Sequence, residues 1–146
     1  MKKQITITLL GVLFIFTSCG TTKETAIAQP QILRDYNTFL ITEISNDKTY
    51  GLTPENPVEV GGVKDSEGPL NERRYLNALT GPNGEKISYF RAGSCCPVNS
   101  ENGFMGKAML DNYRVSWENS KDTVSIFINM YDSGKLKAPF GFGLKK

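Results

Sequence analysis

Residues 113–131 read YRVSWENSKDTVSIFINMY and contain the clearest structural pattern in the chain. In residues 113–117 the apolar side chains occupy every second position, which is typical of a half-buried strand. Hydrophobic side chains alternate in the same way through residues 123–131, and the polar residues 119–122 between the two segments indicate a turn. We therefore predict an antiparallel hairpin for this part of the chain.

Elsewhere the chain predicts short strands and one helix. Strands are expected where β-branched and aromatic residues gather, at residues 38–44, 58–60 and 87–91. Residues 70–79 contain the only plausible helix, with Asn71 as its N-cap. The expected fold is therefore α+β, with a mostly antiparallel sheet of five or six strands and one helix.

The N-terminus has the order of features of a secretory signal peptide. Two lysines precede an apolar run over residues 5–16, which is shorter than the ~20 residues that a helix needs to cross a bilayer. Residues 16–19, FTSC, resemble the lipobox of bacterial lipoproteins, with Phe16 where leucine is most common. In that family the cysteine carries acyl chains such as palmitate and becomes the new N-terminus. The sequence therefore predicts a signal peptide over residues 1–18 and lipidation of Cys19.

Lipidation of Cys19 would place the protein in the bacterial envelope, because two or more acyl chains give stable membrane attachment. Gly20 follows in place of the aspartate that resembles an inner-membrane retention signal, so we expect the outer membrane, on either its periplasmic or its surface face. Residues 19–31 are rich in Thr, Ala and Gln and are expected to be a lipidated, flexible tether. Residues 32–146, about 115 residues, suffice for a single α+β domain.

Composition argues against several classes of function. Without Lys2 and Lys3 of the signal peptide, the 17 basic residues fall to 15, equal to the 15 acidic ones. Nucleic-acid binding requires a clustered basic surface, so we expect no nucleic-acid partner. The chain has no histidine, which excludes Ser-His-Asp and Cys-His relays and imidazole metal ligands. We assign no catalytic residue, no metal and no cofactor.

Cys95 and Cys96 are the two cysteines that remain once Cys19 is acylated, and they are adjacent. Disulfides usually join Cα atoms ~4.4–6.8 Å apart, whereas sequence neighbours lie near ~3.8 Å. A vicinal disulfide would form a rigid, oxidisable knuckle in a loop, and an oxidising compartment favours it. The alternatives are two small, buried, reduced thiols, or a thiol nucleophile or metal ligand whose pKa Arg91 could lower.

Three arginines are candidate anion-binding residues. Arg73 and Arg74 are adjacent, and Arg91 lies near the cysteines. A guanidinium group suits bidentate binding of carboxylate or phosphate. The alternative for the first two is a solvated helix face with an ion pair to Glu72.

Tyr131 and Asp132 follow the end of the last predicted strand and form a candidate loop site. A single carboxylate without a partner makes a weak case for acid–base chemistry. These two residues could converge with Arg91 on one cluster of loops.

Several stretches, spread over about two thirds of the chain, carry a family resemblance: YG at 50–51, NPVEVGG at 56–62, NERRYLNAL at 71–79, GSCCP at 93–97, INMYD at 128–132 and APFGF at 138–142. They resemble a group of short Bacteroidota lipoproteins. Some members carry the label 2-dehydro-3-deoxyphosphooctonate aldolase, an activity of (β/α)₈ barrels of about 250 residues. A domain of this length with one helix is too small for such a barrel, so the resemblance implies a lipoprotein without that activity.

The sequence thus predicts a membrane-anchored envelope lipoprotein with a small binding or structural domain. Its expected partners are membrane lipid, through Cys19, and an unknown envelope protein or ligand. The expected contact elements are the loop at Cys95 and Cys96 and the Gly-Phe-Gly tail at 141–143. The alternative is a thiol-based redox or enzymatic protein that uses the same two cysteines.

Overall fold

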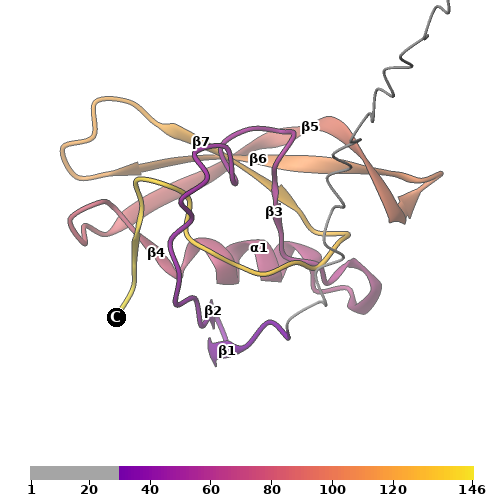
Figure 1. Ribbon diagram of the computed structural model, residues 1–146, viewed down its shortest axis with the longest axis horizontal. Coiled ribbons are helices and arrows are strands. Elements are labelled where there is room, and N and C mark those ends of the chain that lie inside the picture. The colour runs from indigo at the N-terminus through magenta and orange to yellow at the C-terminus, as the bar shows by residue number, and fades with distance from the viewer. Residues whose placement is uncertain (1–29) are drawn as a thin grey trace, which may run out of the picture.

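The computed structural model describes residues 30–146 (Figure 1). The predicted signal peptide, Cys19 and residues 20–29 of the predicted tether lie outside the described residues. Among the described residues, no helix is long and apolar enough to span a membrane. In chain order the elements are β1 (Leu33–Asp35), β2 (Thr38–Phe39), β3 (Val58–Glu59), the 3₁₀ helix η1 (Val63–Asp65), α1 (Gly68–Leu76), β4 (Leu79–Thr80), β5 (Ile87–Phe104), β6 (Lys107–Trp117), β7 (Val124–Asn129) and β8 (Gly143–Leu144).

The main layer is a four-stranded sheet in the order β3-β7-β6-β5. The β5–β6 and β6–β7 pairs are antiparallel, whereas β3 is parallel to β7. Two further two-stranded sheets pair β1 with β2 and β4 with β8, both antiparallel. Over residues 30–146 the predicted α+β class with one α-helix is confirmed, and the β-strands divide among three sheets.

The hydrophobic core lies between α1 and the sheet, and Figure 1 shows α1 along one face of the strands. Tyr75 and Leu76 of α1 are fully buried, as are Val115 of β6 and Ile126 and Ile128 of β7. The three strand residues belong to the alternating apolar series that predicts the hairpin. Alternation therefore places one side of β6 and β7 against the helix, and the predicted β6–β7 hairpin is confirmed.

The helix begins and ends earlier than predicted, at Gly68–Leu76 rather than at 70–79. Pro69 lies in its first turn, where a fixed φ and a missing N–H are compatible with a helix. Asn71 is therefore inside the helix and is not its N-cap, a position that Glu67 occupies. The Asn71 side chain instead donates hydrogen bonds to the carbonyl groups that follow β3.

The predicted strand at 38–44 is mostly wrong. Only Thr38–Phe39 is a strand, and Ile44 makes a single bridge to Ala138. That bridge is parallel, with the Ala138 N–H donating to the Glu43 carbonyl and the Ser45 N–H to the Ala138 carbonyl, and residues 40–43 belong to no strand. β-branched residues raise strand propensity, but a strand also requires a partner that can continue the pairing.

The β5–β6 hairpin is much longer than the predicted strands at 87–91 and 113–117. Its two strands stay paired to the turn between Phe104 and Lys107, with three shifts of register along β5. β7 pairs with β6 only from Asp111 onward. The remaining part, residues 95–110, therefore projects beyond β7 as a two-stranded ribbon, which we call the distal arm.

Candidate functional site

The two adjacent cysteines form a disulfide within the distal arm. Cys95 and Cys96 are bonded through their sulfur atoms, with their Cα atoms 3.7 Å apart. The register of β5 against β6 shifts between Cys95 and Pro97, so the pair occupies a β-bulge, and Cys96 has a left-handed φ of 53°. Of the states that the sequence leaves open, the structure contains the vicinal disulfide, and the disulfide lies in a strand rather than in a loop.

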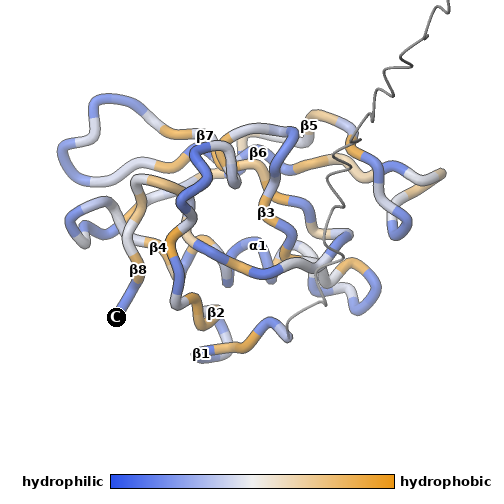
Figure 2. The backbone as a smooth tube through the Cα atoms, viewed as in Figure 1, coloured by the Kyte–Doolittle hydropathy of each residue, from blue (hydrophilic) through white to orange (hydrophobic). Residues whose placement is uncertain are grey.

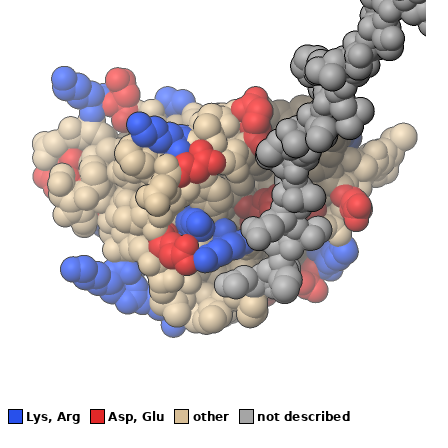
Figure 3. Space-filling view, in the orientation of Figure 1, with Lys and Arg blue, Asp and Glu red and all other residues tan. Residues whose placement is uncertain are grey.

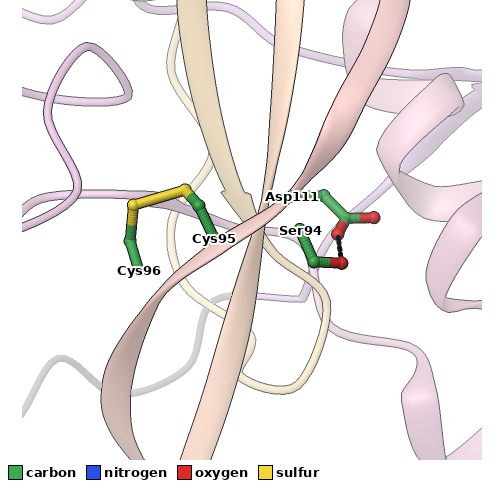
Figure 4. Close-up of a disulfide and its surroundings, with 4 residues drawn as sticks. All are labelled: Ser94, Cys95, Cys96 and Asp111. Atoms are coloured by element: carbon green, nitrogen blue, oxygen red, sulfur yellow. Dashed lines mark hydrogen bonds between the residues drawn. A yellow bond between two sulfur atoms is a disulfide. The ribbon is translucent and has the colours of Figure 1, made fainter.

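A polar cluster lies on the other side of β5, where Figure 4 shows Ser94 and Asp111 facing away from the disulfide. Ser94 Oγ donates a hydrogen bond to Asp111 Oδ1 over 2.8 Å. Arg91 donates from Nε to Asp111 Oδ2 over 2.5 Å and from Nη2 to Oδ1 over 2.7 Å. The guanidinium group thus binds the buried Asp111 carboxylate in a bidentate manner. It does not take the role that the sequence left open, which was to lower the pKa of a cysteine thiol.

Glu72 of α1 completes this cluster from the helix side. Its side chain is fully buried, and Tyr113 donates a hydrogen bond from Oη to Glu72 Oε2 over 2.9 Å. Burial and then the negative charge of Asp111 raise the pKa of Glu72 to about 7. Glu72 Oε1 has no hydrogen-bond partner among the described residues, and a proton on the carboxyl group can be donated to Asp111.

We call these five side chains the Arg91 cluster: Glu72, Arg91, Ser94, Asp111 and Tyr113. It combines a buried pair of acids with a serine hydroxyl and a guanidinium group at the surface. From the sequence, Glu72 is expected only as an exposed ion-pair partner of Arg73 and Arg74. The signal that could have revealed its burial is helical spacing, because Glu72 precedes Tyr75 and Leu76 by three and four positions and shares their face.

The three candidate anion-binding arginines do not form one site. Arg74 is only 4% exposed, and its guanidinium group donates to Glu67 Oε2, to Asn71 Oδ1 and to the Tyr36 carbonyl. Arg73 points to solvent on the same helix, and Arg91 belongs to the cluster above. The structure thus assigns Arg74 an internal structural role, because its donors are occupied within the protein.

Asp132 ties the distal arm to the loop after β7. Its carboxylate accepts hydrogen bonds from Ser100 Oγ and Asn102 Nδ2 of the arm and from Asn129 Nδ2. Tyr131 follows the same turn and donates its backbone N–H to Asn129 Oδ1. No hydrogen bond among the described residues joins Asp132 to Arg91, so the predicted convergence is not found.

The tip of the distal arm exposes two adjacent apolar side chains. Phe104 is 84% exposed and Met105 is 86% exposed. A Cβ atom on Gly103 would lie 2.0 Å from the Lys107 carbonyl oxygen, so glycine is required for the close approach of the strands at this turn. Figure 2 colours the tip toward the hydrophobic end of its scale, and Figure 3 shows it without charged side chains.

The Gly-Phe-Gly tail is not the exposed element that the sequence indicates. Phe142 is 4% exposed and packs edge-on against Trp117, with ring centroids 5.4 Å apart. Phe140 is half exposed, and the ammonium group of Lys48 lies 5.3 Å from the centre of its ring. The tail therefore closes the core beside β6.

The described residues outline a small α+β domain with a vicinal disulfide on a projecting hairpin. Within residues 30–146, no three acidic or cysteine side chains gather as metal ligands. Comparison of the chain with protein-family models, with curated proteins and with solved structures gives no match.

Proposed function

We propose that this chain is a membrane-anchored envelope lipoprotein whose domain binds a partner through the tip of the distal arm. The observation that carries the proposal is the exposure of Phe104 and Met105 at 84% and 86%. Isolated apolar side chains are common on protein surfaces, but two large neighbours at the end of a projecting element are typical of a contact site.

The ordering of the arm supports this role. Lys107 Nζ donates to Asn99 Oδ1 across the two strands, and the Ser100 backbone N–H donates to the Gly106 carbonyl. Together with the contacts of Asp132, these bonds hold the arm before any partner arrives. A contact element that is already ordered loses less conformational entropy on binding than a mobile loop.

The proposed anchor is Cys19, in the lipobox-like residues 16–19. Two or more acyl chains hold a protein stably on a bilayer, and Gly20 after the cysteine favours the outer membrane. The proposed partners are therefore membrane lipid and an envelope protein or ligand at the same membrane.

A photoreactive phenylalanine analogue at position 104 tests the proposal in intact cells. We expect irradiation to produce a discrete crosslinked adduct of higher mass, because the side chain at the tip would lie in the contact. The adduct is detected by blotting of membrane fractions and identified by mass spectrometry. The matched control carries the same analogue in place of the exposed Asn83, in the turn before β5, and is expected to give no adduct.

A Cys19→Ser variant of the protein tests the anchor in the same cells. Loss of the acyl chains is expected to move the protein from the membrane fraction to the soluble fraction and to reduce the adduct several-fold. Retention of the serine variant in the membrane fraction would contradict the anchor. Adducts from both positions or from neither would contradict the contact at the tip.

The vicinal disulfide supports a second candidate function, thiol–disulfide exchange. Cys95 and Cys96 are bonded and partly buried on the arm. A dithiol on a partner protein would transfer two electrons and two protons to the pair, leaving two cysteine thiols here and a disulfide on the partner.

Thiol counting checks the state of the pair. We expect no alkylation of Cys95 or Cys96 when the protein is denatured with an alkylating reagent and without a reductant, and two alkylated residues after reduction. Intact-mass spectrometry measures the difference. Two alkylated residues in the unreduced sample would show that the disulfide does not form in the envelope, and the second candidate would then be abandoned.

A further inference from the structure

A groove of about 260 Å³ opens beside Tyr89, whose ring packs edge-on against Tyr113 of the Arg91 cluster with the ring centroids 6.0 Å apart. It lies between the end of α1, β4, the start of β5 and the C-terminal segment. Its floor is apolar, since it includes Leu76, Leu79 and Ile87, which are core residues exposed by 9% or less. These side chains belong to packed elements, so the floor is a fixed surface.

The rim of the groove is basic. Lys86 and Lys145 line it, both are exposed, and neither forms an ion pair with another described residue. No acidic side chain lines the groove. The acid next to Lys86 in the chain, Glu85, accepts two hydrogen bonds from Asn83 in the preceding turn.

Two arginines add to the positive charge near this rim. Arg34 donates from Nη1 to the Lys145 carbonyl over 2.6 Å. Tyr89 lines the groove, and burial raises the pKa of its hydroxyl. The positive charge of Arg73 opposes this rise, so Arg73 lies near the Tyr89 hydroxyl. The hydroxyl itself donates to Asn77 Oδ1, so the polar wall is ordered.

We propose that this groove binds a free small molecule with an anionic head and an apolar body, of the medium-chain carboxylate class. The apolar body would rest on the buried floor and on the aliphatic stems of Lys86 and Lys145, and the anion would lie between the two ammonium groups. A cavity of about 150 Å³ accommodates benzene, so a groove of this volume suits a body of roughly eight carbons and not a full lipid chain. The inference does not depend on the proposed function of the arm.

The probe is octanoate, which is titrated into the full chain. The chain carries Cys19→Ser, so that no bilayer is needed to keep it in solution and none competes with octanoate for the groove. Amide chemical shifts in an NMR spectrum report both affinity and place. We expect saturable shifts at Thr80 and Ile87, much weaker binding of butanoate because it covers less of the floor, and no saturation with octylammonium because its charge is opposite. Equal binding of octylammonium, or shifts confined to other parts of the domain, would overturn the proposal.

A Lys86→Gln, Lys145→Gln double variant is expected to bind octanoate about tenfold more weakly, since each exposed ion pair contributes modestly. The matched control is Lys64→Gln with Lys121→Gln, which removes the same charge from exposed lysines elsewhere and should leave affinity unchanged. Equal weakening in both variants would indicate a general charge effect and contradict the site. A last experiment adds phosphatidylglycerol vesicles to the protein. If the vesicles bind at these residues and octanoate does not compete with them, the surface belongs to a bilayer and the free-ligand proposal is overturned.

Discussion

Replacing Glu72 with glutamine is expected to make the protein about 3 kcal/mol more stable than the wild type at about pH 8, and less than about 1 kcal/mol more stable at about pH 5. Glutamine keeps the shape of the side chain. Its oxygen can accept the hydrogen bond from Tyr113, and its amide can donate to Asp111 as a protonated carboxyl does. The substitution therefore removes a buried negative charge and retains the cluster.

The sign follows from the raised pKa of Glu72. Its folded-state pKa is about 7, against 4.5 for the ordinary group, because of burial and then the charge of Asp111. The folded protein binds this proton more tightly than the unfolded chain. The contribution to stability is complete below about pH 4.5 and is lost as the pH rises through about 7. Glutamine cannot ionise, so this part of the pH dependence disappears.

Urea denaturation at several values between about pH 5 and pH 8 measures the effect. Glu118→Gln, which changes an exposed glutamate, is the control and should follow the wild type throughout. Glu43 and Glu85 do not interfere, because hydrogen bonds from Lys135 and from Asn83 lower their pKa values and both stay ionised in this range. If Glu72→Gln and the wild type gave parallel curves, the interpretation of Glu72 as a buried acid with a raised pKa would be wrong.

Arg74→Ala is expected to lower the free energy of unfolding by about 2–3 kcal/mol. The substitution removes donors to Asn71, to Glu67 and to the Tyr36 carbonyl, and it leaves a cavity behind a side chain that is 4% exposed. It also removes the cation that lies 5.3 Å from the centre of the Tyr36 ring. The loss would thus weaken the attachment of the β1–β2 turn to α1, which would still be held by the hydrogen bond from Asn77 Nδ2 to the Asn37 carbonyl.

Arg73→Ala is the matched control, because it removes the same charged group from the next position of the helix. Arg73 is exposed, so its replacement should change the free energy of unfolding by less than about 0.5 kcal/mol. Urea denaturation of both variants at one pH provides the comparison. Equal effects of the two substitutions would contradict the structural role assigned to Arg74.

The parts of the fold that the sequence predicts are those whose burial follows from local alternation. The pairing of β6 with β7 could be predicted, because every second side chain in residues 113–117 and in most of residues 123–131 is apolar. The segment at 38–44 has the same kind of residues but only Thr38–Phe39 forms a strand. Its C-terminal end makes only a single bridge, from Ile44 to Ala138, and whether a partner so distant in the sequence continues the pairing is invisible to a local pattern.

The candidate site shows the same division. Adjacent cysteines identify a possible disulfide, but their position in a bulge of an extended strand depends on pairing with β6. Adjacent arginines suggest an anion site, yet Arg74 is buried because it reaches the Tyr36 carbonyl, 38 positions earlier. Side-chain type alone does not distinguish an exposed guanidinium group from a buried one.

By itself the sequence determined the α+β class, the β6–β7 hairpin and the expectation of lipidation at Cys19, because each depends on the order of neighbouring residues. Only the tertiary structure decided that Glu72 is a buried acid, that Arg74 is internal and that the arm carries an exposed apolar tip. Glu72 and Tyr113 are 41 positions apart, and their contact exists only when α1 packs on β6. Burial, and with it the charge state of a carboxyl group, is a property of that packing.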